Sequence, residues 1–346
     1  MNSIRIEYDF NDDKILLDVM RIKTVEKSNN LTSKGLEYAL SYSASGLKSF
    51  ASQFELLRSD LFICKLAQEL INTGEKSTRL DEVKRALGRI MEELTKNSGI
   101  EISVHGQDKN GLFDKLNAHL NKMWTTVGKN NNNLLSPMLF VFAEHPRKHI
   151  FKIPQTVNYC VDTRPISPLV EDAYGKYFVL GQLLTHSFLH REIREGGGAY
   201  AGGVQVDKSG LFSFYSYRDP NLEETFEKYN QSLEYASKGN FTNQDIVDAK
   251  IVAFQGIDRA KDPANDGLEF FKRNVNADQL NRVRKNILST TREDLIQSAK
   301  YLEKSKSSKT VFSMSELKEE NKLRKEVWEV FDLGMLGYNK DNGINI

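Results

Sequence analysis

Apolar and polar positions alternate at the start of the chain. Residues 1–14 place isoleucine, tyrosine and phenylalanine between acidic side chains, and residues 14–23 continue with an apolar-rich run. This pattern predicts a strand at each place. Because the opening is acidic, it is unlike a targeting peptide, which is basic and poor in acid. We expect the chain to begin part-way through a domain and to be a piece of something longer.

Apolar positions then recur every three or four residues, which is typical of amphipathic helices. The predicted elements are a helix at 32–72, a helix at 80–96 capped by Ser77 or Thr78, a strand at 100–105 and a helix at 111–124. Four consecutive asparagines, 130–133, follow in a polar low-complexity stretch that cannot bury a core. The sequence therefore predicts an Asn-rich linker at 128–147 that separates two domains.

Strand and helix signals also alternate after the linker. The pattern predicts a strand at 149–162 and a helix at 167–195, which a serine caps and a proline begins. Three glycines end this helix. The strands 200–206 and 211–217 then form a hairpin, with Gly210 where the turn needs a positive φ.

The remaining elements are mostly helices whose starts and stops are marked by caps and glycines. They are a helix from Asp219 to Gly239, one capped by Thr242 with Asp245, one capped by Thr290 with Glu293, a strand at 310–314 and a charged helix ending near Phe331. This order indicates an α+β fold with an antiparallel sheet and helices packed on one face. We expect residues 148–333 to be a complete domain and 334–346 to be a flexible tail.

Composition narrows the possible functions. Among 346 residues, 48 Lys and Arg balance 47 Asp and Glu, and 39% of residues are hydrophobic. A near-neutral chain has no basic excess with which to bind nucleic acid or a membrane surface, so neither partner is expected. No apolar stretch approaches the roughly 20 residues that span a bilayer. Cys64 and Cys160 lie far apart without a CxxC motif, so no disulfide framework or thiolate metal site is predicted.

Two histidine pairs have the i, i+4 spacing that a zinc site uses for two ligands. His186 and His190 fall on a predicted helix, but no glutamate lies between them to act as a general base. His145 and His149 enclose Pro146 and cannot share one face of a regular helix. The sequence therefore predicts no metal site, and the chain by itself is expected to bind no zinc and to cleave no peptide.

The glycines at 196–198 satisfy the G-x-G-x-x-A dinucleotide pattern with Ala201, but in the wrong context. A dinucleotide fingerprint follows a strand and opens a helix, whereas these glycines end a helix and open a strand. They also separate Arg194 from Tyr200. Small residues let a bound backbone approach closely, and a guanidinium and a phenol supply directed hydrogen-bond donors at that point.

The run Leu-His-Arg-Glu-Ile-Arg-Glu-Gly-Gly-Gly-Ala-Tyr-Ala-Gly-Gly at 189–203, with Tyr-Ser-Tyr-Arg-Asp-Pro at 215–220, resembles a known family. The match is to the C-terminal half of the pitrilysin-type (inverzincin) zinc metallopeptidases, in the presequence protease and falcilysin subfamily. Weaker agreement continues through 239–246. The resemblance implies two related α+β domains, with residues 1–127 as the truncated rear part of a third pitrilysin-type domain and 148–333 as the complete fourth. A domain that lacks its N-terminal part is expected to expose apolar surface and to self-associate.

The resemblance also implies a function for the complete protein. In this family zinc is bound by an H-x-x-E-H helix in the N-terminal half, which this chain lacks. By the same resemblance, Arg194 and Tyr200, with Gly197 and Gly198 beside them, bind an unstructured peptide substrate such as a presequence, and no catalytic or metal-binding residue falls in this chain. The N-terminal catalytic half is the implied partner, and the mitochondrial matrix or another organelle is the implied location. The alternative is a catalytically inactive scaffold or binding subunit of the same fold.

Overall fold

The computed structural model describes a set of ranges separated by short gaps. They are residues 10, 12–45, 47, 56–73, 77–96, 111–124, 148–153, 155–169, 171–260, 262, 267–273, 275–313 and 328–332. The expected strand at 100–105, the Asn-rich linker and the tail lie outside them, as does most of the strand expected at 1–14. Within the described ranges, no helix is both long and apolar enough to cross a membrane.

The chain divides into two compact units that do not follow chain order. The first unit comprises Met1–Glu26, Ile63–Val141 and Lys261–Asn274, and the second comprises Lys27–Phe62, Phe142–Ala260 and Val275–Ile346. The assignment of residues 1–127 and 148–333 to successive domains of one family stays a prediction.

The described part of the first unit consists of helices. They are α2 (Asp13–Ser33, as far as Glu26), α4 (Leu56–Thr73, from Ile63), α5 (Thr78–Lys96), α6 (Leu112–Trp124) and α10 (Leu268–Arg273). Leu17, Leu70 and Leu80 form its buried cluster. An ion pair of 2.7 Å joins Lys84 Nζ to Asp13 Oδ1. Helices α5 and α6 lie where the sequence predicts them, and the Ser77 hydroxyl accepts the Arg79 N–H at 3.2 Å.

Two predictions for this part of the chain are wrong. Residues 14–23 belong to helix α2 rather than to a strand, because a continuous apolar run fits a helix face as well as a buried strand. The helix expected at 32–72 is interrupted: α3 (Gly35–Ser45) and α4 are separate helices, and α2 extends to Ser33.

The described part of the second unit contains a six-stranded sheet with the order β3-β4-β2-β5-β1-β6. Its strands are β1 (Lys148–Lys152), β2 (Tyr159–Pro165), β3 (Ala201–Asp207), β4 (Leu211–Tyr217), β5 (Ser308–Ser313) and β6 (Glu329–Asp332). Strand β1 pairs in parallel with β5 and β6, and the other neighbours pair antiparallel. The mostly antiparallel sheet and its helices confirm the α+β class.

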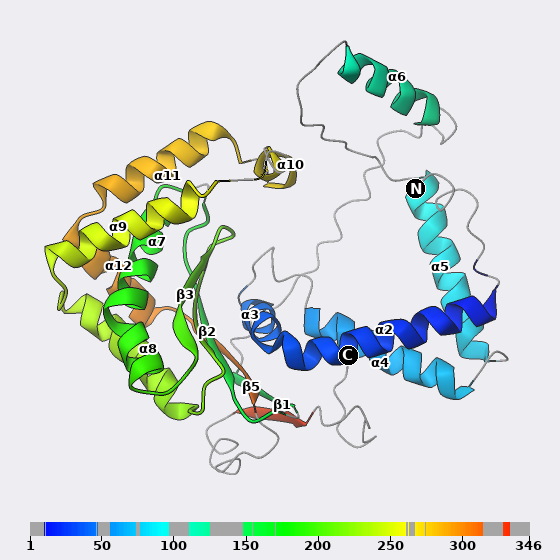
Figure 1. Cartoon of the computed structure of the whole chain (residues 1–346), viewed down its shortest axis with the longest axis horizontal. Helices are drawn as coiled ribbons and strands as arrows, with labels where there is room; N and C mark the ends of the chain where they lie inside the picture. The colour runs from blue at the N-terminus through cyan, green and yellow to red at the C-terminus, as the bar shows by residue number, and fades with distance from the viewer. Residues whose placement is uncertain are drawn as a thin grey trace. The chain divides into compact units, whose positions relative to one another are not determined.

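Helices lie on both faces of this sheet, several on one face and α3 on the other (Figure 1). One face carries α7 (Tyr174–Leu184), the π-helix η2 (Thr185–Glu195), α8 (Glu223–Ser237), α9 (Asn243–Ile257), α11 (Ala277–Ser289) and α12 (Arg292–Lys304). On the other face, Tyr38 and Ala39 of α3 pack against an aromatic cluster that includes Phe151 and Phe312. The prediction of helices on one face only therefore missed α3, because its partner strands lie more than 100 residues further along the chain.

Several boundaries in the second unit differ from their predictions. The strand expected at 149–162 is two strands, β1 and β2, with β5 between them. The helix expected to begin at residue 167 begins at Tyr174, because the preceding residues form turns instead: the Glu171 N–H binds the Pro168 carbonyl at 2.9 Å and the Tyr174 N–H binds the Glu171 carbonyl at 3.3 Å. The helix expected to start at Asp219 begins at Glu223. Residues near Phe331 form strand β6 and not the end of a helix.

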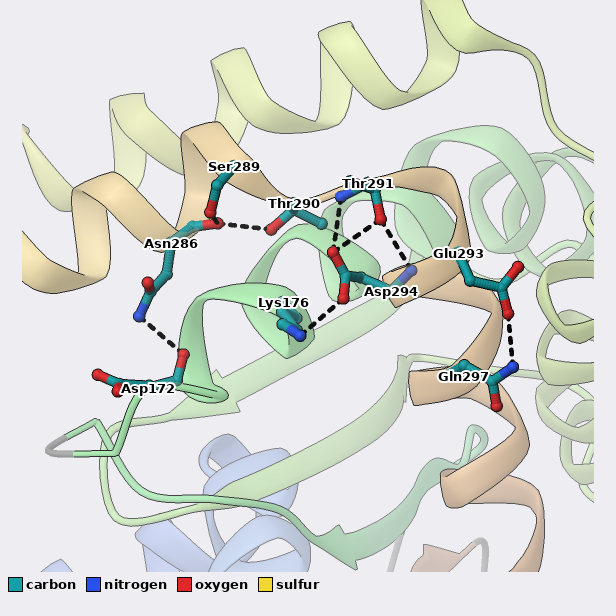
Figure 2. Close-up of polar contacts among 9 residues, drawn as sticks. All are labelled: Asp172, Lys176, Asn286, Ser289, Thr290, Thr291, Glu293, Asp294 and Gln297. Carbon is teal, nitrogen blue, oxygen red and sulfur yellow. Dashed lines mark hydrogen bonds and ion pairs between the residues drawn. The ribbon is translucent and has the colours of Figure 1, made fainter.

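The capping box predicted at Thr290 lies one residue later. The Thr291 hydroxyl accepts the Asp294 N–H at 3.2 Å, and the Asp294 carboxylate accepts the Thr291 N–H at 2.9 Å (Figure 2). Thr290 instead ends α11, where its hydroxyl donates to the Asn286 carbonyl at 2.7 Å. The box predicted at Thr242 with Asp245 is confirmed.

Candidate functional site

The candidate site begins where the π-helix η2 ends in a glycine turn. Gly198 has φ +80°, and its N–H binds the Arg194 carbonyl at 3.1 Å. The Ala199 N–H reaches back to the Ile193 carbonyl, also at 3.1 Å. These bonds resemble a Schellman cap widened by one residue, as the wider turn of a π-helix requires. A Cβ at Gly197 would lie 2.7 Å from the Ile193 carbonyl oxygen, so only glycine fits there without a backbone shift.

Buried polar groups hold this turn from the other side. The Asn221 side chain donates to the Gly197 carbonyl at 2.7 Å, and the main-chain carbonyl of Asn221 accepts from the Asn158 side chain at 3.1 Å. Asp219 is fully buried and accepts the Asn221 N–H at 2.9 Å and the Thr225 hydroxyl at 2.7 Å. Burial raises the pKa of Asp219, and these hydrogen bonds partly offset the rise. The turn is therefore fixed by the fold rather than by its glycines alone.

Arg194 is exposed at the end of η2. Its Nη1 lies 2.9 Å from His190 Nε2. The nearby carboxylate of Glu192 binds Lys228 at 2.9 Å and Arg191 at 3.0 Å, and these two cations lower the pKa of Glu192, Lys228 first. Within the described ranges, no carboxylate lies at ion-pair distance from Arg194. Among the described residues, its guanidinium is thus a charged donor that no carboxylate pairs.

Tyr200 lies just before strand β3, with 68% of its surface exposed. Its N–H extends the β3–β4 ladder to the Tyr217 carbonyl at 3.1 Å, and its ring centroid lies 5.9 Å from that of Tyr217. The Tyr217 ring in turn lies 5.2 Å from that of Tyr159. The side chain of Tyr200 therefore lies outside the core, at the end of an aromatic row.

The structure thus brings Arg194, Gly197, Gly198 and Tyr200 together at the η2–β3 junction. Their role in substrate binding stays a prediction. Arg218, which lies beside Tyr217, was not selected from the sequence, although it stands in the same Tyr-Ser-Tyr-Arg-Asp-Pro segment. Arg218 differs from its neighbours by a positive φ. The sequence does not predict this angle, because the residue is neither a glycine nor an asparagine.

The histidines do not assemble a metal site in the described residues. His186 and His190 lie on η2, and His149 of β1 binds Glu329 of β6 at 2.7 Å. His145 lies outside the described residues. Across the described ranges, no group of three or more His, Cys, Asp or Glu side chains is placed to hold a metal ion, so these residues do not fit zinc. Cys64 and Cys160 are both buried thiols.

Similarity to known proteins supports the resemblance seen in the sequence. Residues 148–316 match the family model described as the PreP C-terminal domain. The mitochondrial presequence protease of Danio rerio is 38% identical over 152 residues, covering 44% of this chain and 15% of that protein. That of Emericella nidulans is 29% identical over 336 residues, covering 96% of this chain and 31% of that protein.

Solved structures give weaker similarity. A protease from Helicobacter pylori has a TM-score of 0.46 at 14% identity, covering 58% of this chain and 52% of that one. Pitrilysin has a TM-score of 0.39 at 13% identity, covering 54% of this chain and 22% of that one.

Strands β1–β5, helices α7, α8, α9, α11 and α12 and the η2–β3 junction lie within residues 148–316, which form a domain of the PreP C-terminal class. Residues 148–316 therefore belong to the PreP C-terminal domain family, and 96% of the chain aligns with a presequence protease, which supports the resemblance to the C-terminal half of that type of peptidase. It spans 15% to 31% of the length of the relatives cited above.

Proposed function

We propose that this chain is the non-zinc, substrate-binding half of a zinc metalloendopeptidase that degrades short unstructured peptides such as presequences. The names of the relatives support a peptidase that acts on presequences in mitochondria. The observation that carries the proposal is the η2–β3 junction, where two exposed donors, Arg194 and Tyr200, flank a glycine turn fixed by Asn221.

The chemistry of these donors fits an extended peptide. A peptide backbone presents carbonyl oxygens, and a guanidinium and a phenol both donate hydrogen bonds to such acceptors. Donors fixed before the reaction stabilise a carbonyl oxygen as it gains negative charge. Arg194 and Tyr200 would thus bind and orient the peptide near the bond to be cleaved.

The partner in this proposal is the N-terminal catalytic half of the same protein. Zinc bound there would activate the attacking water. Because the described residues of this chain do not fit zinc, its part is to bind and orient the peptide.

The test is to replace both donors in the complete protein, with its catalytic half present. We expect Arg194→Ala and Tyr200→Phe each to lower kcat/KM for an unstructured peptide by about 10²–10³-fold, the scale of one oxyanion donor, with the melting temperature unchanged. Arg191→Ala is the matched control, because Arg191 is also exposed and on η2 but is paired with Glu192. Normal kinetics in both variants would contradict the proposal. If the complete wild-type protein binds peptide but does not cleave it, the inactive scaffold is the correct function.

A further inference from the structure

Arg218 adopts a backbone conformation that arginine rarely takes. It has φ +51°, the one positive φ among the non-glycine residues in the part of the chain that the structure describes. A glycine or an asparagine would adopt this conformation at lower cost. Strain of this kind persists only where the surroundings impose it, and it often marks a functional position.

The surroundings of Arg218 do impose it. The next residue, Asp219, pairs with Asn158 through both main-chain bonds, at 2.8 Å and 2.9 Å. The buried Asp219 carboxylate is bound by Thr225 and by the Asn221 N–H. The main chain must therefore turn sharply at Arg218, directly after strand β4. Asn221 of the same segment also binds the glycine turn beside Arg194, through the Gly197 carbonyl.

The side chain of Arg218 lies on the row of tyrosines that ends at Tyr200. Its Cζ is 5.5 Å from the centroid of the Tyr217 ring, and that ring contacts both Tyr159 and Tyr200. The electrostatic interaction with Tyr217, followed by the side-chain hydrogen bond with Tyr159, raises the pKa of Arg218. In the described ranges no carboxylate lies at ion-pair distance from its guanidinium, and the Asp219 carboxylate is bound elsewhere.

We propose that Arg218 and the row formed by Tyr159, Tyr217 and Tyr200 are a subsite for a carboxylate of the bound peptide. The inference rests on the proposed function, because it assumes that a peptide lies along Arg194 and Tyr200. The guanidinium of Arg218 hydrogen-bonds the side chains of Tyr159 and Tyr217, and because it carries five N–H donors it retains others for a carboxylate. The tyrosine rings offer an apolar surface to the rest of the same peptide residue. The carboxylate can belong to an acidic side chain or to the peptide's C-terminus.

The experiment measures peptide binding to the full chain by fluorescence anisotropy. Three unstructured peptides of otherwise identical sequence separate the sources: one amidated with a single glutamate, one with a free C-terminus and no acidic residue, and one amidated with no carboxylate. The variants are Arg218→Gln, which removes the charge, and Arg218→Gly, which also relieves the positive φ. Arg191→Gln is the control, since it removes an exposed arginine that already has an internal partner.

Wild type is expected to bind one of the carboxylate peptides more tightly than the carboxylate-free peptide. In both Arg218 variants the ratio of these two affinities is expected to fall about tenfold. Their affinity for the carboxylate-free peptide and the behaviour of Arg191→Gln should not change. Arg218→Gly should melt at or above the wild-type temperature, which shows that lost preference is not lost folding. Equal weakening of all three peptides, or an unchanged preference, would overturn the subsite while leaving the proposed function standing. If wild type binds none of the peptides, both the subsite and the proposed function fail.

Discussion

The two compact units bury their apolar side chains very differently. In the second unit the sheet is covered on both faces, and large rings such as Tyr229, Phe212 and Phe214 are fully buried. In the described part of the first unit, the buried cluster is Leu17, Leu70 and Leu80, with a few partly buried neighbours.

Helix α2 shows the consequence of this difference. Ile15, Val19, Ile22 and Val25 lie on it with 44% to 66% of their surface exposed, although Leu17 of the same helix is buried. A sheet presents two apolar faces and can be covered on both, whereas a helix that packs through one stripe leaves its other residues in solvent. The second unit should therefore contribute most of the free energy of unfolding. Substitutions in the two units should change that free energy by different amounts, and in one case with opposite signs.

The largest expected effect is in the core of the second unit. Phe214 is fully buried and stacks on Tyr229 with ring centroids 5.1 Å apart. Phe214→Ala should lower the free energy of unfolding by about 3–5 kcal/mol, measured by urea denaturation. Ile22→Ala in the first unit should change it by less than about 0.5 kcal/mol, because Ile22 is exposed. Comparable losses in both variants would contradict the comparison.

The same glycine-to-alanine change should have opposite signs in the two units. Gly198 needs its φ of +80°, so Gly198→Ala should destabilise the second unit by about 1–2 kcal/mol. Gly88 lies inside α5, where an added Cβ meets nothing within 4 Å, so Gly88→Ala should stabilise the first unit by about 0.5–1 kcal/mol. Thermal unfolding of both variants checks this. A loss in each would show that α5 is constrained by contacts as η2 is.

Acid should weaken the second unit through Asp294, which joins α12 to α7 (Figure 2). Burial alone would raise the pKa of Asp294, but the hydrogen bonds from Lys176 and Thr291 outweigh it and lower the pKa to about 2. A group with a lowered pKa stabilises the fold above its unfolded value and loses that contribution as the pH falls through its folded value. About 1–2 kcal/mol should therefore be lost between roughly pH 4 and pH 2.

Asp294→Asn isolates this contribution. It should cost about 1–2 kcal/mol at pH 7 and flatten the pH dependence between pH 4 and pH 2, measured by denaturation at several pH values. An unchanged pH dependence in the variant would assign the acid sensitivity to other carboxylates.

The smallest effect on stability is expected on the exposed face of α2. Replacing Val19, Ile22 and Val25 with serine should change the free energy of unfolding by less than about 1 kcal/mol, because these side chains are largely exposed. The replacement should also reduce self-association of the chain, which sedimentation measures. If the wild-type chain is already a monomer at high concentration, the expectation of self-association is wrong.

The sequence by itself determined the features that depend on residues close together in the chain. The capping box of Thr242 with Asp245, the hairpin turn at Gly210 and the helix end at Gly239 are set by hydrogen bonds or φ angles within a few residues. The glycines between Arg194 and Tyr200 also mark their turn locally, although Asn221 holds it from outside, and this local signal is why the candidate site was visible in the sequence. Recognition of the family rested on the same short run of residues.

Only the tertiary structure decided features that depend on distant partners. A serine and a proline at 167–168 carry a good start signal, yet the helix begins at Tyr174, where contacts from Lys208 and Asn286 hold the preceding turn. Residues near Phe331 became a strand because β1 offered an edge to pair with. Arg218 takes its positive φ where Asn158, 60 positions earlier, fixes the main chain of Asp219. Each of these outcomes is a hydrogen-bond pairing between segments far apart in the chain, and no pattern within one segment encodes which partner it will meet.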